Sequence, residues 1–171
     1  FMAKAHSMAY ACMPMFFWPA PAIPVRKVIV DINDKLAEDA KNKLGFENFS
    51  SNWEEVINNK DIDVVDICTP NDTHPAMAIA AAKAGKHIIC EKPLARNAKE
   101  AKEMLDAVKD TNIIHMVAFN YRRTPAVALA KKIISENKIG EIINFRGTYL
   151  QDWPADPNGP LSWRFQKEIA G

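Results

Sequence analysis

The chain of 171 residues is long enough for one domain, or one domain and part of a second, and for a core that needs no disulfide bonds. Hydrophobic residues make up 48% of it and charged residues 25%, which excludes a disordered or fibrous protein. The 22 basic and 21 acidic side chains nearly cancel, so neither a nucleic acid nor a membrane surface is an expected partner. The three cysteines form no CxxC pair, so we expect no disulfide framework, no metal site and a cytoplasmic location.

The N-terminal part is apolar and rich in proline. Residues 7–25 carry no charge and are followed by small residues near 20–22, which imitates a secretory signal. Several prolines interrupt this stretch, however, and its apolar part is too short to span a bilayer. We therefore expect a buried helix over residues 3–13 and a Pro- and aromatic-rich loop over 14–24, whose aromatic rings either pack or line a ligand cleft.

From Arg26 onward, short apolar runs alternate with segments of helical periodicity. The apolar runs predict strands, and the periodic segments, which start at capping residues such as the Ser51–Glu54 box and Asn97, predict helices. The later strands are uninterrupted apolar runs, as is typical of parallel strands covered by helices on both faces. The expected strands are 28–30, 64–68, 87–90 and 113–119, and the expected helices are 36–44, 51–57, 73–84 and 98–108.

The pattern changes after Phe119. Thr124 and Pro125 predict the start of a helix, and in 141–150 apolar and polar residues alternate. Such alternation is typical of an antiparallel strand with one face in solvent. We therefore expect an α/β domain with a doubly wound parallel sheet in residues 1–121, and the beginning of an α+β domain with a mostly antiparallel sheet in 122–171.

Residues that directly follow the strands are the candidates for chemistry, because doubly wound sheets bind ligands beyond the carboxyl ends of their strands. Asp31 either accepts hydrogen bonds from ribose hydroxyls, which would also repel a 2′-phosphate, or caps a turn. His74 either meets a ligand or caps its helix, and Tyr121–Arg123 either clamps a phosphate or carboxylate or pairs with surface acids. The remaining histidines have the positions of structural residues: His6, His87 and His115.

The segment Cys90–Pro93 is the sharpest single feature. Glu91 and Lys92 at the mouth of a parallel sheet can serve acid–base chemistry, and Pro93 permits a cis Lys–Pro bond. By spacing alone, a solvated Glu–Lys pair at a strand end is the commoner explanation. No glycine precedes Gly45, so a pyrophosphate could bind at the N-terminus of the first helix only if a glycine turn lies before it.

Taken in this order, the segments resemble the Gfo/Idh/MocA family of NAD(P)-dependent oxidoreductases. The resemblance covers nearly the whole chain and favours a chemical role for the Glu-Lys-Pro turn over a solvated pair. It implies a Rossmann domain followed by an α+β domain built on an open antiparallel sheet. It rests on residues 64–74, 85–95 and 119–123, and on Trp163–Arg164 leading to Ala170–Gly171.

The resemblance also implies a role for each candidate. Lys92 would be the catalytic lysine, which binds the reacting hydroxyl and helps to move its proton. Asp31 would hold the adenosine ribose, which favours NAD over NADP as the cofactor. The other expected cofactor-binding residues are Phe1 and Met2 at the end of the glycine turn, Thr69, Pro70, Asn71 and His74 along the cofactor path, Glu91 with Lys92 near the nicotinamide, and Asn120, Arg122, Trp163 and Arg164 around the nicotinamide and substrate.

The resemblance finally implies that this chain is a fragment. The first strand and the leading glycines would precede Phe1, and an Asp-x-Gly-x-x-His segment that completes the active site would follow Gly171. The whole protein is expected to transfer a hydride between nicotinamide and a secondary alcohol of a sugar, cyclitol or polyol, as a homo-oligomer, whereas the fragment alone is expected to be inactive. Two alternatives keep the fold: an NAD-dependent glycoside hydrolase without net redox change, and a ligand-sensing regulator, against which Lys92 argues.

Overall fold

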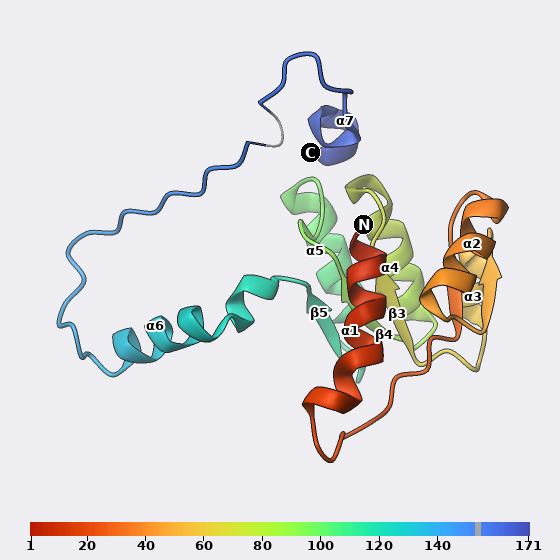
Figure 1. The fold of residues 1–171 in the computed structure, drawn as a ribbon, viewed down its shortest axis with the longest axis horizontal. Helices are drawn as coiled ribbons and strands as arrows, with labels where there is room; N and C mark the ends of the chain where they lie inside the picture. Colours follow the sequence, from red (N-terminus) through yellow and green to blue (C-terminus); the bar gives the residue numbers. More distant parts are fainter. Residues whose placement is uncertain (153–154) are drawn as a thin grey trace.

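Parallel strands with helices on both sides form the larger part of the molecule (Figure 1). The computed structural model describes residues 1–152 and 155–171. The sheet order is β1–β2 in one group and β3–β4–β5 in the other, with all pairs parallel. The strands are β1 (Val28–Val30), β2 (Asn48–Ser50), β3 (Val64–Ile67), β4 (His87–Cys90) and β5 (His115–Val117).

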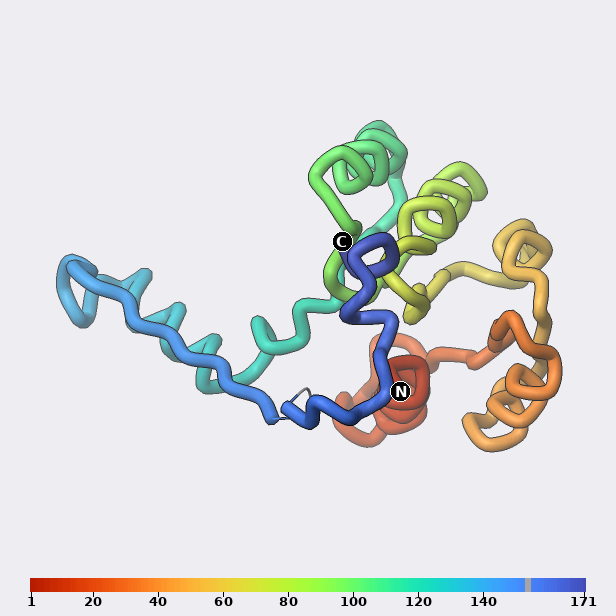
Figure 2. Tube along the Cα trace, turned by 90° about the horizontal axis from the view of Figure 1, so that it is seen from above, coloured from red at the N-terminus to blue at the C-terminus, as the bar shows by residue number. Residues whose placement is uncertain are grey.

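Helices cover both faces of the three-stranded group, as the views of Figures 1 and 2 agree. Helices α4 (His74–Lys83) and α5 (Ala98–Val108) lie on one face, and α1 (Met2–Phe16) lies on the other. Between the sheet and α4 and α5 lies the core, in which Ile67 and Cys90 are almost inaccessible to solvent. The prediction of a parallel α/β sheet is therefore confirmed. The elements beside β1 and β2 are α2 (Asp34–Leu44) and α3 (Trp53–Asn58).

Several expected helix ends are confirmed at the level of hydrogen bonds. The side-chain oxygen of Asn97 accepts a bond from the Glu100 backbone N–H, and Gly45 closes α2 with a left-handed φ of 71°. Helix α3 differs from the prediction: Asn52, and not Ser51, caps it by accepting bonds from the backbone of the first turn. An Asn side chain reaches the free N–H groups of a first turn as readily as Ser does, which explains how the cap lies one residue later than predicted.

Helix α1 is longer than predicted because it continues through Pro14. A proline removes one backbone donor from a helix, and the surrounding bonds can still form. Here Phe17 N–H donates to the Met13 carbonyl at 3.1 Å, so the helix ends beyond the proline and the loop starts later than residue 14. None of the helices in the described parts of the chain is long and apolar enough to cross a membrane.

Strand β2 was not predicted, and β5 is shorter than predicted. The three residues of β2 form no apolar run, and Phe49 is partly exposed, so burial leaves no signal there. Their pairing is fixed by backbone bonds instead, such as that from Asn48 N–H to the Lys27 carbonyl at 3.0 Å. At β5, the apolar run extends on both sides of the three paired residues, so its length overstates the strand.

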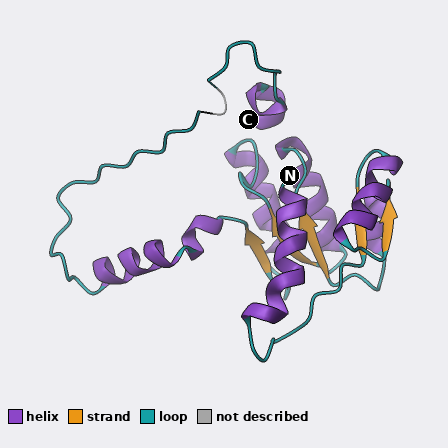
Figure 3. Cartoon of the chain, in the orientation of Figure 1, coloured by secondary structure: helices purple, strands orange, loops and turns teal. Residues whose placement is uncertain are grey.

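The C-terminal region departs most from the prediction. Helix α6 (Pro125–Ser135) forms as expected and points away from the sheet (Figure 1). Residues 141–150 were expected to form an antiparallel strand, but the described part of the chain gives them no pairing partner, and Figure 3 draws them as loop. A strand needs a neighbour to satisfy its backbone groups, which explains why alternation alone produced none. The remaining elements are η1 (Asn71–Thr73), η2 (Asn120–Arg123), η3 (Trp163–Phe165) and α7 (Lys167–Ala170).

Candidate active site

Most of the candidate residues lie at the edge where the parallel strands end. The N-terminus of α1, the turns that follow β3 and β4, and α7 all lie on this side of the sheet (Figure 1), and Figure 2 looks down onto it. Helix α7 contacts η1 there, although the two are about a hundred residues apart in sequence. The fold thus brings the beginning, the middle and the end of the chain to one edge.

His74 joins the turn after β3 to the turn after β4. Its ring is fully buried, with Nε2 3.0 Å from the carbonyl oxygen of Thr69 and Nδ1 3.0 Å from that of Pro93. The ring thus lies between the backbone carbonyls of two separate turns. His74 therefore braces two turns of the candidate site. Its predicted place on the cofactor path stays a prediction.

The turn after β3 is held by its own hydroxyls. The hydroxyl of Thr69 lies 2.5 Å from that of Thr73, which donates to the Pro70 carbonyl at 2.7 Å. Asn71 is 5% exposed, and its side-chain amide donates to the Ala170 carbonyl at 2.9 Å. In this structure Asn71 thus anchors α7 to the sheet edge.

Arg96 and Gly171 complete this docking of the C-terminal segment. The Arg96 guanidinium donates to the Glu168 carbonyl at 2.5 Å while it also pairs with the Glu100 carboxylate. Gly171 has a φ of 95°, and a Cβ there would lie 2.5 Å from the Arg96 carbonyl oxygen. Glycine is required at this position both for the backbone conformation and for the close approach.

Glu91 and Lys92 differ sharply in their surroundings. Glu91 is 6% exposed, and its carboxylate accepts from the Lys92 backbone N–H and from His6, each at 3.1 Å. The Lys92 side chain is exposed, and no residue in the described ranges bonds its amine. The Lys92–Pro93 peptide bond is cis. The turn thus buries its carboxylate as a support and presents its amine outward.

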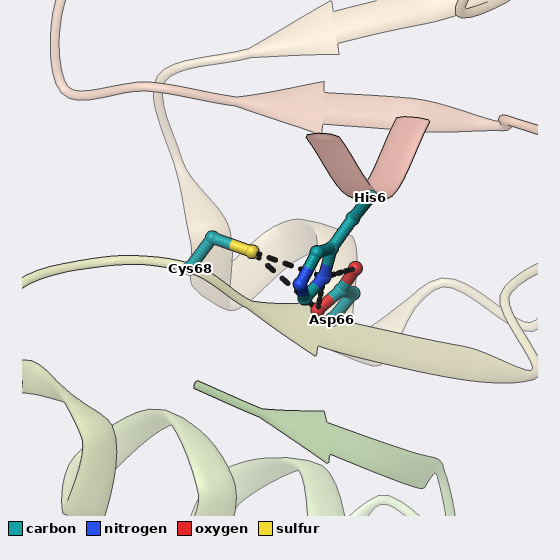
Figure 4. Close-up of side chains that lie close together, drawn as sticks. All are labelled: His6, Asp66 and Cys68. Atoms are coloured by element: carbon teal, nitrogen blue, oxygen red, sulfur yellow. Dashed lines mark hydrogen bonds and ion pairs between the residues drawn. The ribbon is translucent and has the colours of Figure 1, made fainter. Parts of the chain in front are cut away.

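His6 is the residue of this site that the sequence analysis missed, since it was interpreted as structural. Its Nδ1 lies 2.8 Å from one carboxylate oxygen of Asp66, and its Nε2 faces Glu91 (Figure 4 shows the Asp66 side). The hydrogen bond to Asp66 raises the pKa of His6 above its usual value, against the lowering effect of burial. The signal that could have found it is Asp66 itself: a carboxylate inside the apolar strand Val64–Ile67 must have a partner.

His6, Asp66 and Cys68 are close enough for their side-chain atoms to ligate one ion. In this structure, however, the three side chains take part in hydrogen bonds. Both ring nitrogens of His6 face carboxylates, and the Tyr10 hydroxyl donates to Asp66 at 2.6 Å. Burial, followed by the Asp66 carboxylate, raises the pKa of the Cys68 thiol, which disfavours the thiolate that metals bind. The expectation that no metal binds stays a prediction.

Apart from Thr69 and Pro70, which belong to the turn after β3, the other predicted site residues are not joined to these turns by side-chain bonds among the described residues. Asp31 is exposed at the end of β1, where it accepts from Asn33 N–H at 3.1 Å. The Arg164 guanidinium lies over the Trp163 ring, 4.5 Å from its centre. The roles of these residues stay predictions. The exposed ones, besides Asp31 and Arg164, are Phe1, Asn120 and Arg122, whereas Met2, Thr69, Pro70 and Trp163 are half-buried.

Doubly wound sheets bind nucleotides beyond the carboxyl ends of their strands, and the polar turns of this chain lie there; the arrangement is that of a nucleotide-binding α/β domain. The chain belongs to the oxidoreductase family with an NAD-binding Rossmann fold, whose sequence model matches residues 23–119. Residues 127–171 match the GFO/IDH/MocA C-terminal domain. Family, fold and dinucleotide cofactor thus agree with the sequence analysis.

Among its relatives, levoglucosan dehydrogenase of Pseudarthrobacter phenanthrenivorans is 71% identical over 171 residues, which are 100% of this chain and 44% of that protein. The scyllo-inositol 2-dehydrogenase (NAD(+)) of Bacillus subtilis is 38% identical over 80% of this chain and 40% of its own length. A solved levoglucosan dehydrogenase in complex with NADH and levoglucosan superimposes with a TM-score of 0.97, at 70% identity over 99% of this chain and 46% of that one. The chain thus spans less than half the length of these relatives.

Proposed function

We propose that the protein containing this chain is an NAD-dependent dehydrogenase that oxidises a secondary alcohol of a sugar or cyclitol, with levoglucosan among its substrates. The observation that carries the proposal is Lys92, an exposed amine at the end of β4 on a turn that Glu91 and His74 hold in place. The 71% identity with a levoglucosan dehydrogenase over the whole chain supports this choice of substrate. Cytoplasmic location and homo-oligomerisation stay predictions.

The residues present fit a dinucleotide. Helix α1 has 15 residues, and no described side chain caps its N-terminus, so its first backbone N–H groups are free to meet a pyrophosphate near Phe1 and Met2. Among the described residues, a bond is made to one oxygen of the exposed Asp31 carboxylate, and the other oxygen would accept from ribose hydroxyls. Bound NAD would supply the acceptor for the hydride.

The chemistry left to this chain is that of binding and proton transfer. The Lys92 amine would bind the reacting hydroxyl oxygen and take its proton as the carbon is oxidised. The buried Glu91 carboxylate accepts the Lys92 backbone N–H at 3.1 Å. This bond fixes the backbone of Lys92, so its side chain extends from a fixed position. The Asn71 and Arg96 bonds that dock α7 would bring Trp163 and Arg164, a few residues upstream, towards the same edge.

The first test is Lys92→Met in the full-length protein, with NADH formation from NAD and levoglucosan as the measurement. We expect the rate to fall by roughly 10²–10⁴-fold, because proton transfer by a positioned side chain is lost, while NADH binding is largely retained. Lys99→Met makes the same change on exposed residue Lys99 of α5 and should leave the rate unchanged. Equal rates for wild type and Lys92→Met would contradict the proposal. Turnover without net NADH formation would indicate a glycoside hydrolase.

A further inference from the structure

The bridge made by His6 joins three elements at the sheet edge. The ring comes from the second turn of α1, Asp66 comes from β3, and Glu91 follows β4. One ring nitrogen lies 2.8 Å from an Asp66 oxygen, and the other lies 3.1 Å from a Glu91 oxygen. Figure 4 shows how the ring reaches down from α1 onto the Asp66 strand.

This geometry calls for a charged ring. A neutral imidazole has one N–H, whereas two ionised carboxylates each need a donor, so the bridge is complete only as an imidazolium. Among the described residues, no basic side chain other than His6 is paired with Asp66 or Glu91. Without it, two carboxylates would lie near each other in a half-buried site with no positive partner, which is unfavourable.

The other titratable groups that face the bridge are neutral near pH 7. They are Tyr10 on α1 and Cys68 after β3, both of which contact Asp66. Burial is the main cause that raises the pKa of each. The charge state of the bridge is therefore decided by His6 and its two carboxylates.

The bridge also leads to the reacting amine. The Glu91 carboxylate binds His6 with one oxygen and the Lys92 backbone N–H with the other. His6 is therefore linked through one side chain to the residue that we expect to handle the proton. We propose that His6 is a positioning residue whose imidazolium, held between Asp66 and Glu91, fixes the Glu-Lys-Pro turn against α1 and thereby sets the position of the Lys92 amine. The proposal rests on the proposed dehydrogenase function.

The kinetic test is His6→Gln in the full-length protein. A Gln amide is neutral and carries both of its donors on one nitrogen, so it cannot replace an imidazolium that donates from two separate nitrogens. We expect kcat for levoglucosan oxidation to fall by about 10- to 100-fold, with KM changed by less than about threefold, because a displaced amine slows the reaction more than it weakens binding. His115→Gln, on exposed residue His115 of β5, is the matched control and should behave as wild type. An unchanged kcat in His6→Gln would overturn the proposal.

The pH test separates a bridging cation from mere packing. A histidine whose pKa is raised in the folded state stabilises the fold fully below its unfolded pKa of about 6.5, and this stabilisation is lost as the pH rises through the folded pKa. The melting temperature of wild type should thus exceed that of His6→Gln by more at about pH 6 than at about pH 9. The same difference at both pH values would overturn the bridge.

Direct titration of the wild-type imidazole by NMR gives the third readout and does not depend on the folding of His6→Gln. We expect a His6 pKa above the usual value, and a decrease in Glu91→Gln, which removes one of the two charges. A His6 pKa at or below the usual value, or one that Glu91→Gln leaves unchanged, would overturn the bridge. If wild type oxidises no sugar, the proposed function fails, whereas the titration and melting data still decide the bridge.

Discussion

The sheet region and helix α6 have similarly apolar sequences and opposite degrees of burial. In the sheet, Ile67 and Ile88 are 2% and 5% exposed, whereas on α6 Leu129 and Ile134 are 57% and 46% exposed. The strands and helices of the sheet region follow one another closely along the chain, so each apolar face is covered by its sequence neighbours. Periodicity predicts which face of a helix is apolar, but it does not predict what covers that face.

The largest expected contrast between the two regions is in stability. In the 171-residue chain, Ile67→Ala should lower the free energy of unfolding by about 2–5 kcal/mol, because it opens a cavity in the core. Ile134→Ala, a change of the same size on α6, should alter it by less than about 0.5 kcal/mol. Urea denaturation of both variants measures the difference. Comparable losses would mean that α6 is packed as tightly as the sheet.

An intermediate effect is expected where the C-terminal segment meets the sheet edge. Asn71→Ala removes the buried amide that holds the Ala170 carbonyl and should cost about 1–3 kcal/mol. It should also speed hydrogen exchange in α7 selectively. Asn58→Ala removes a bond of the same type, from Asn58 to the Glu54 carbonyl, at an exposed site and is the control. If exchange in α7 is equal in the two variants, Asn71 does not anchor the segment.

The smallest effects should be the same in both regions. Lys102 pairs with Asp106 on α5, and Lys132 pairs with Glu136 at the end of α6, each four residues apart and largely exposed. Changing either lysine to Ala should shift the free energy of unfolding by less than about 0.5 kcal/mol, because solvent screens such pairs. Urea denaturation again gives the comparison. A large loss at Lys102 alone would show that surface charge, and not only burial, separates the regions.

Secondary structure could be predicted from the sequence where local patterns determine it, and could not where it depends on distant partners. Strands β3 and β4 and the caps at Asn97 and Gly45 could be predicted, because local patterns and local hydrogen bonds determine them. Strand β2 could not, since its pairing with β1 leaves no apolar signature.

In the candidate site, the Glu-Lys-Pro turn was identified from the family resemblance, but the long-range contacts around it were not. His6 lies 85 residues from Glu91 in sequence, and Asn71 lies 99 residues from Ala170. A single sequence carries no pattern that links partners so far apart. A polar residue in an apolar strand, such as Asp66, indicates that a partner exists without telling which one it is.

The bracing of two turns by His74 has a consequence for motion. Because one buried ring holds the carbonyls of both Thr69 and Pro93, these turns should shift together as a rigid body. Any hinge that moves one of these turns relative to the rest of the protein would then have to lie outside them. The pair of turns is therefore a suitable frame on which to superimpose ligand-free and ligand-bound forms of the protein.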